Sequence, residues 1–177
     1  MIGPILRSMR PRQWSKNVFV LAPLVFAQKF RDPSAILVAL SAFAAFSLMA
    51  SGVYLVNDSM DYEEDRKHPQ KKNRPIAAGL LRVPHALGLA VLLFASSIGL
   101  SWTIGPRFLM TLGVYLVMNL AYSSGLKRIV ILDVMMIAAG FVIRVIAGAV
   151  ALNVPMSDWL FICTTMVALF LAFTKRR

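Results

Sequence analysis

The sequence predicts an all-α fold, a polytopic bundle of transmembrane helices, on three observations. Hydrophobic residues make up 58% of the 177 residues, and charged residues only 15%. The apolar residues form long blocks with few charges, as membrane-spanning helices require. The 19 Lys and Arg residues lie mostly between these blocks, where orientation in a bilayer explains them. We therefore attribute the net charge of +11 to membrane topology and expect no nucleic-acid partner.

Six blocks are predicted as spans of a single membrane domain, residues 1–177, and they cover residues 14–28, 35–56, 86–104, 108–123, 129–152 and 159–174. The first block is short and contains Pro23, so its length alone leaves a re-entrant or interfacial segment open. Six spans place most basic residues on one side of the membrane, whereas five would put the basic N-terminus outside. We therefore expect a multi-pass protein of the cell (inner) membrane, with its N-terminus and its active-site loops cytoplasmic.

A cytoplasmic Asp-rich loop, residues 57–85, is predicted after the second span, and its first residues include Asp58, Asp61, Glu63, Glu64 and Asp65. On a helix that continues past residue 56, Asp58, Asp61 and Asp65 would lie within an arc of about 60°. Carboxylates so placed repel one another, and Mg²⁺ removes that penalty because it binds one or two carboxylates together with waters and phosphate oxygens. We predict a Mg²⁺ site at Asn57, Asp58, Asp61 and Asp65, the alternative being a solvated loop.

Basic residues follow the acidic ones directly, which places positive charge beside the predicted metal. Arg74 offers bidentate contacts to phosphate, and Lys71 offers a mobile point charge. Tyr122 and Lys127 belong to a later loop on the same side of the membrane, from which they would reach a shared phosphate site. These residues predict binding of a diphosphate-containing substrate. The basic residues are explained equally well by the preference of Lys and Arg for cytoplasmic loops.

Two charged residues interrupt the fifth block. Asp133 stands near its start, and Arg144 follows eleven residues later on nearly the same helix face. A charge near the centre of a span costs about 2.5 to 3.5 kcal/mol on insertion scales, so we expect Arg144 to face a polar cavity or a partner. A functional role and a structural ion pair are both open for this residue.

The segments Asn57–Asp65, with its N-D-x-x-D-x-x-x-D spacing, and Arg74–Gly79 resemble the first aspartate motif of the UbiA superfamily of intramembrane prenyltransferases. Four further segments are most similar to its decaprenyl-phosphate phosphoribosyltransferases: Arg10–Asn17, Asp65–Pro69, Tyr122–Lys127 and Gly140–Gly148. The resemblance covers essentially the whole chain. It implies transfer of 5-phosphoribose from phosphoribosyl diphosphate to a polyprenyl (decaprenyl) phosphate, with release of diphosphate, in the synthesis of arabinan precursors for the cell envelope.

The resemblance also implies residue roles. Asp58 and Asp61 would bind Mg²⁺ and act in catalysis, with help from Asn57 and Asp65. Phosphates or ribose would be held by Lys16, Lys71, Arg74, Tyr122, Lys127 and Arg144, and Arg144 is also a catalytic candidate. The lipid phosphate would attack the anomeric carbon of the ribose while the metal stabilises the departing diphosphate.

Members of the superfamily usually have about nine spans, and a second polar motif follows the sixth, where this chain reads Phe173–Arg177 and ends. We therefore expect the chain to contain six spans of a nine-span fold. The chain would then be a fragment, a truncated and inactive gene product, or a chain that a partner completes. A homo-oligomer is left open. Two other functions are also open: transfer of a prenyl group from prenyl diphosphate to an aromatic acceptor, and a non-catalytic membrane scaffold or half of a transporter.

Overall fold

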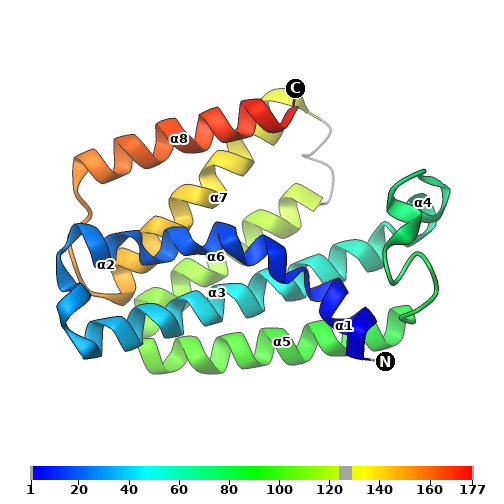
Figure 1. Ribbon diagram of the computed structural model, residues 1–177, viewed down its shortest axis with the longest axis horizontal. Helices are drawn as coiled ribbons and strands as arrows, with labels where there is room; N and C mark the ends of the chain where they lie inside the picture. The colour runs from blue at the N-terminus through cyan, green and yellow to red at the C-terminus, as the bar shows by residue number, and fades with distance from the viewer. Residues whose placement is uncertain (1, 124–128, 177) are drawn as a thin grey trace.

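The computed structural model describes residues 2–123 and 129–176, and every regular element in this part of the chain is a helix. The prediction of an all-α fold is confirmed. Five long helices form the bundle: α3 (Pro33–Met60), α5 (Val83–Ile104), α6 (Pro106–Ser123), α7 (Val130–Ala151) and α8 (Asp158–Arg176). Figure 1 shows α1 (Ile2–Met9), α4 (Tyr62–Lys67) and the C-terminal end of α8 toward the same end of the bundle.

Three helices of the described residues are long and apolar enough to cross a membrane: α3, α5 and the part of α7 from Ile131 to Ala151. They correspond to the predicted spans at residues 35–56, 86–104 and 129–152. The apolar part of α8, Asp158–Thr174, is shorter. The helices support an integral membrane protein, and the count of six spans stays a prediction.

The first predicted span, residues 14–28, is built differently from the others. It overlaps an eleven-residue 3₁₀ helix, η1 (Pro11–Leu21), and the short helix α2 (Ala22–Phe26) that follows it. A 3₁₀ helix rises about 2.0 Å per residue and an α-helix about 1.5 Å, so the two together reach about 30 Å, close to the hydrocarbon thickness of a bilayer. Extended helical geometry therefore lets a short block run along the bundle, as Figure 1 shows for the segment between α1 and α2.

Local sequence explains where the long helices begin. Asp32 caps α3, because its Oδ1 accepts hydrogen bonds from the Ser34 backbone N–H at 2.9 Å and from the Ser34 hydroxyl at 2.7 Å. These bonds lower the pKa of the Asp32 carboxyl. Gly105, with a φ of 140°, ends α5, and Pro106 begins α6 directly after it.

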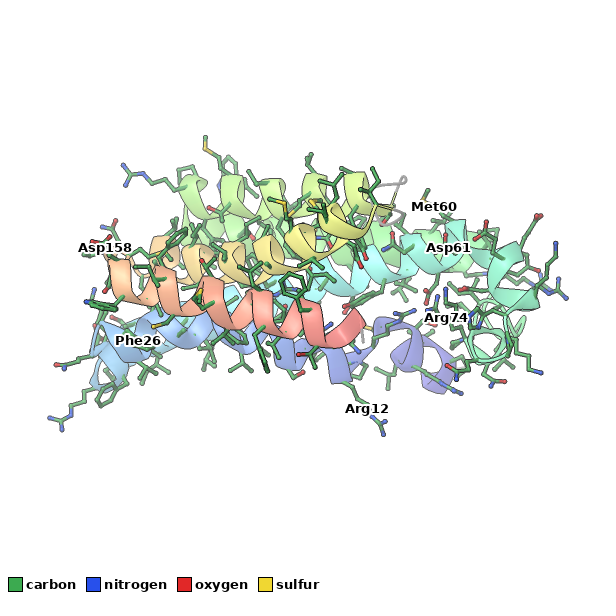
Figure 2. The ribbon with its side chains drawn as sticks, turned by 90° about the horizontal axis from the view of Figure 1, so that it is seen from above. Arg12, Phe26, Met60, Asp61, Arg74 and Asp158 are labelled. Atoms are coloured by element: carbon green, nitrogen blue, oxygen red, sulfur yellow. The ribbon has the colours of Figure 1, made fainter. Side chains whose placement is uncertain are left out.

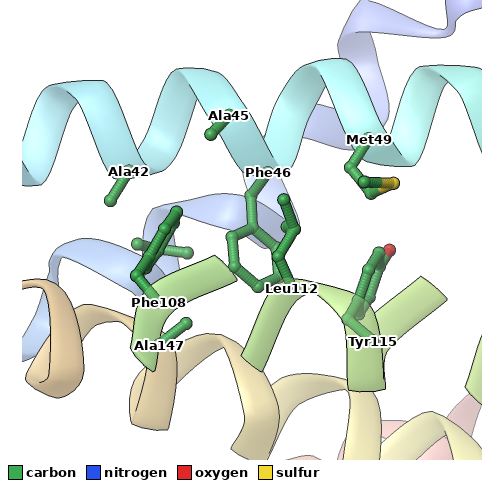
Figure 3. Close-up of a cluster of buried hydrophobic side chains, with 9 residues drawn as sticks. Ala42, Ala45, Phe46, Met49, Phe108, Leu112, Tyr115 and Ala147 are labelled. Atoms are coloured by element: carbon green, nitrogen blue, oxygen red, sulfur yellow. The ribbon is translucent and has the colours of Figure 1, made fainter. Parts of the chain in front are cut away.

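The main core lies where α3 faces α6 and α7. Small side chains on α3, such as Ala42 and Ala45, make room for two rings, Phe46 and Phe108, whose centroids are 6.0 Å apart (Figure 3). The ring of Tyr115 packs 5.1 Å from that of Phe46 and is 4% exposed. The core thus fixes the ring of Tyr115, and its hydroxyl group extends beyond the cluster to the site described below.

Gly148 on α7 packs closely against the N-terminal segment. A Cβ atom at this position would overlap the carbonyl oxygen of Val20 and lie 2.9 Å from its carbonyl carbon. Both are backbone atoms, so neither can turn away as a flexible side chain would. The absence of a side chain at Gly148 therefore sets how deeply η1 packs against α7.

We expect Gly148→Ala to push η1 away from α7 and to lower the free energy of unfolding by about 1 to 3 kcal/mol, as overpacking does. Gly113→Ala is the matched control, because a Cβ at Gly113 in α6 meets nothing within 4 Å. That change should stabilise the helix by about 0.5 to 1 kcal/mol. Unfolding of both variants in detergent measures the effects, and a shift of the same sign in both would contradict the packing argument.

Candidate functional site

The Asp-rich segment is more helical than predicted. Helix α3 continues to Met60, α4 follows at Tyr62–Lys67, and a 3₁₀ turn, η3, covers Lys71–Asn73. Only Asp61 interrupts the two helices, and the helical hydrogen bonds run on through it: Asp61 N–H donates to Asn57 O at 2.9 Å, and Asp65 N–H donates to Asp61 O at 2.8 Å. The near-continuous helix carries Asp58 and Asp65, two turns apart, to buried positions with 4% and 1% exposure.

Asp58 and Asp65 meet in a set of ion pairs that we call the charged cluster, formed by Arg10, Asp58, Asp65, Lys71 and Arg74. Arg74 joins the two carboxylates, because its Nη1 lies 3.0 Å from Asp58 Oδ1 and 2.6 Å from Asp65 Oδ2. Lys71 Nζ lies 3.8 Å from Asp65 Oδ1. The predicted binding residues Lys71 and Arg74 are thus brought to two of the predicted metal ligands. Figure 2 shows this end of the molecule, with Asp61 and Arg74 far from Phe26 and Asp158.

Arg10 belongs to this cluster although the sequence did not single it out as a site residue. Its Nη2 donates to both carboxylate oxygens of Asp58, at 2.6 and 2.8 Å, and its guanidinium lies 4.8 Å from the centroid of the Tyr54 ring. Arg10 adopts a left-handed backbone, with φ 52° and ψ 59°, which is uncommon outside glycine. The one sequence signal for a functional role of Arg10 is its place at the start of the Arg10–Asn17 segment. Its positive charge is no such signal, because the orientation of the chain in the membrane also explains a basic N-terminus.

The predicted metal ligands fit Mg²⁺ only in part. Asn57 Oδ1 is buried and has no hydrogen-bond partner among the described residues, and an amide oxygen next to Asp58 suits a hard cation. The described residues hold no group of three His, Cys, Asp or Glu side chains that could bind a metal. Guanidinium groups hold Asp58 and Asp65, while Asp61 lies half-buried at the helix junction, and a metal site at these residues stays a prediction. One or two carboxylates with Asn57 still match the usual protein share of a Mg²⁺ shell.

A cavity of about 580 Å³ opens beside the charged cluster, between η1, α3, α6, α7 and α8. Its lining includes three predicted site residues, Lys16, Tyr122 and Arg144, which come from η1, α6 and α7. Lys127, predicted with them, lies outside the described residues. Arg144 lies in the wall of this cavity, among both polar and apolar side chains.

Arg144 is 6% exposed and donates to three neutral acceptors. Its Nε lies 2.8 Å from Asn17 Oδ1, its Nη1 2.6 Å from Gly140 O, and its Nη2 3.0 Å from the Tyr115 hydroxyl. The guanidinium also lies over the ring of Tyr115, 4.9 Å from the centroid. Asn17 and Tyr115 were not predicted, because only the tertiary fold brings η1 and α6 to this point of α7.

The ion pairs of the described residues do not include Arg144. Asp133 accepts a hydrogen bond of 2.7 Å from the Tyr122 hydroxyl. This bond joins the end of α6 to the start of α7 and fixes Tyr122 at the cavity wall.

Tyr54 connects the charged cluster to the cavity. It lies one helical turn before Asp58 on α3, its ring lies beneath Arg10, and it lines the cavity. A ligand with phosphate groups at one end can therefore contact the charged cluster while its remainder occupies the cavity.

The sequence matches the UbiA prenyltransferase family over residues 17–175. It is 43% identical to the decaprenyl-phosphate phosphoribosyltransferase of Corynebacterium glutamicum, over 97% of this chain and 53% of that protein. It is 38% identical to the enzyme of the same name from Mycobacterium tuberculosis, over 99% of this chain and 60% of that protein. The chain thus spans between 53% and 60% of the length of these two relatives.

Two solved structures share the fold. A digeranylgeranylglyceryl phosphate synthase superposes with a TM-score of 0.80 at 18% identity, over 95% of this chain and 60% of that one. A UbiA homolog from Archaeoglobus fulgidus bound to GPP and Mg²⁺ superposes with a TM-score of 0.76, also at 18% identity, over the same shares. At such identities the likeness establishes the fold alone.

We expect Arg74→Gln to lower the free energy of unfolding by about 1 to 3 kcal/mol at pH 7, because it leaves two buried carboxylates with less compensation. Unfolding of the variant and the unchanged chain in detergent at pH 7 tests this. Lys72→Gln is the control, because this substitution removes the same charge from an exposed position. An equal effect of both substitutions on the free energy of unfolding would contradict the role of Arg74.

Proposed function

The chain belongs to the UbiA prenyltransferase family, and on that premise we propose that it serves the Mg²⁺-dependent transfer of 5-phosphoribose from phosphoribosyl diphosphate to a polyprenyl phosphate such as decaprenyl phosphate. Diphosphate is released, and the product feeds the synthesis of arabinan precursors in the cell envelope. The observation that carries the proposal is the junction at Tyr54 between a charged cluster and a cavity among apolar helices. Sequence identities of 38% and 43% to enzymes of that name support the choice of donor.

The charged cluster is the proposed diphosphate site. Lys71 and Arg74 supply positive charge to the phosphate oxygens. Asn57 and Asp58, with Asp61 and Asp65 beside them, would hold Mg²⁺. When bound, the ion would neutralise the charge that develops on the departing diphosphate.

The cavity is the proposed place for the groups that react. An oxygen of the lipid phosphate forms a bond to C1 of the ribose, and the bond from C1 to the diphosphate oxygen breaks, with its electron pair leaving on diphosphate. Lys16, Tyr122 and Arg144 line the cavity and orient the substrates, and Lys127 is the further phosphate ligand that the sequence predicts. The polar loops are proposed to face the cytoplasm from the cell membrane, where a soluble donor reaches them.

Transfer of a prenyl group to an aromatic acceptor is the second candidate. It is favoured by one observation, the fold that the chain shares with a homolog bound to GPP and Mg²⁺. The two reactions differ in what carries the diphosphate, a sugar or an isoprenoid. A non-catalytic scaffold would bind neither donor.

The donor test uses the purified chain in lipid nanodiscs with Mg²⁺. We expect it to bind labelled phosphoribosyl diphosphate at least about tenfold more tightly than geranyl diphosphate. Preference for geranyl diphosphate would support the prenyl reaction, and a folded chain that binds neither would support the scaffold. Labelled lipid formed on addition of decaprenyl phosphate would show the transfer itself.

Asp58→Asn should weaken binding of phosphoribosyl diphosphate about tenfold or more, because it removes a carboxylate from the proposed metal shell. Omitting Mg²⁺ should lower the affinity of the unchanged chain to a similar level. Glu63→Gln is the matched control, since Glu63 is an exposed carboxylate on α4. Equal affinity of Asp58→Asn and the unchanged chain would refute the metal role.

A further inference from the structure

A stripe of polar side chains on α3 faces the Arg10–Asn17 segment. We call it the polar stripe, and it consists of Ser47, Ser51, Tyr54 and Asp58. Spacings of four, three and four residues place these side chains on one face of the helix, over about three turns. Each of them contacts a residue of the segment, and the partners follow in the reverse order along the chain. The stripe therefore sets the register between α3 and the N-terminal segment.

Ser51 lies in the middle of the polar stripe and makes two contacts that we call the Ser51 clamp. Its hydroxyl oxygen accepts a hydrogen bond of 3.0 Å from Trp14 Nε1, and the hydroxyl donates to Met9 O at 2.9 Å. It also lies 2.8 Å from Ser47 O, a contact that serine commonly makes inside a helix. Ser51 is 0% exposed, so without its hydroxyl the buried partners of the clamp would lose this contact and gain no water in exchange.

The two contacts of the Ser51 clamp fall on either side of Arg10. Met9 O belongs to the peptide group that precedes Arg10, and Trp14 follows four residues after it. Arg10 has a φ of 52°, and a left-handed residue other than glycine persists only where the surrounding structure holds it. The clamp thus helps to keep this turn in the form that brings the Arg10 side chain to Asp58.

We infer that Ser51 is a positioning residue for the proposed transfer, because it sets where Arg10 meets Asp58. It acts through the backbone at Met9 and the indole of Trp14, not through contact with a substrate. Ser51 is neither part of the charged cluster nor among the described residues that line the cavity. The clamp itself rests on these contacts alone, whereas its effect on the donor rests on the proposed function.

Loss of the Ser51 clamp would change the charged cluster in two ways. Arg10 donates to both carboxylate oxygens of Asp58, so a displaced Arg10 would leave Arg74 as the remaining cation of the described residues on this buried group. Positive charge would also move away from the place proposed for the diphosphate. Both changes oppose the binding of an anion.

The clamp is tested first without a substrate, by unfolding the purified chain in detergent. If Ser51 holds Arg10, Arg10→Gln should change the equilibrium constant of unfolding at least about threefold less in a Ser51→Ala background than in the unchanged chain. Ser97→Ala is the matched control background, because Ser97 on α5 is also 0% exposed and its hydroxyl donates to Ala45 O of α3 at 2.7 Å. In that background the effect of Arg10→Gln should stay the same.

Binding of labelled phosphoribosyl diphosphate in nanodiscs with Mg²⁺ tests the effect of the clamp on the site. We expect Ser51→Ala to weaken binding about threefold to tenfold, the range that one hydrogen bond is worth, and Ser97→Ala to leave it unchanged. A purely structural role would lower the stability of both variants and move neither affinity. If Ser51→Ala does not fold, Trp14→Phe replaces it in both experiments, since it keeps an aromatic ring and removes the indole N–H donor.

The outcomes separate the clamp from the proposed function. An equal effect of Arg10→Gln in the unchanged chain and in the Ser51→Ala background would overturn the clamp. If the unchanged chain binds the donor, equal or tighter binding by Ser51→Ala would overturn the positioning role. If the unchanged chain binds no donor, the proposed function falls, and the unfolding experiment alone decides whether the clamp stands.

Discussion

The hydrogen bonds of Arg144 are the interaction on which the rest of the site depends. They join α7 to η1 through Asn17 and to α6 through Tyr115, so one guanidinium holds three segments around the cavity. The position of η1 in turn places Arg10, at its N-terminal boundary, against Asp58 on α3. The geometry of the charged cluster therefore depends on a contact inside the bundle.

Electrostatics divide the site into two environments. In the charged cluster three cations face two buried carboxylates, so the cluster has an excess of positive charge before any metal binds. That excess favours phosphate groups even though carboxylates are present. Around Arg144 the hydrogen-bond acceptors are neutral, so its charge is less compensated than the charges of the cluster.

Patterns within one segment could be predicted from the sequence, and contacts between distant segments could not. Long apolar blocks predicted α3, α5 and α7, and helical spacing predicted that Asp58 and Asp65 lie on one side. The 3₁₀ form of η1 leaves no mark in the apolar pattern. Arg10 reaches Asp58 across 48 positions of sequence, a contact that no pattern within one segment indicates. Asn17 and Tyr115 escaped prediction for the same reason.

The place of Tyr54 constrains how the proposed transfer would proceed. Its ring lies between the charged cluster, which is the proposed diphosphate site, and the cavity, which is the proposed place for the lipid, so in the proposed reaction the bond between ribose and diphosphate would lie near this ring. Diphosphate would then leave toward Lys71 and Arg74, the exposed side, while the new lipid product stays in the cavity.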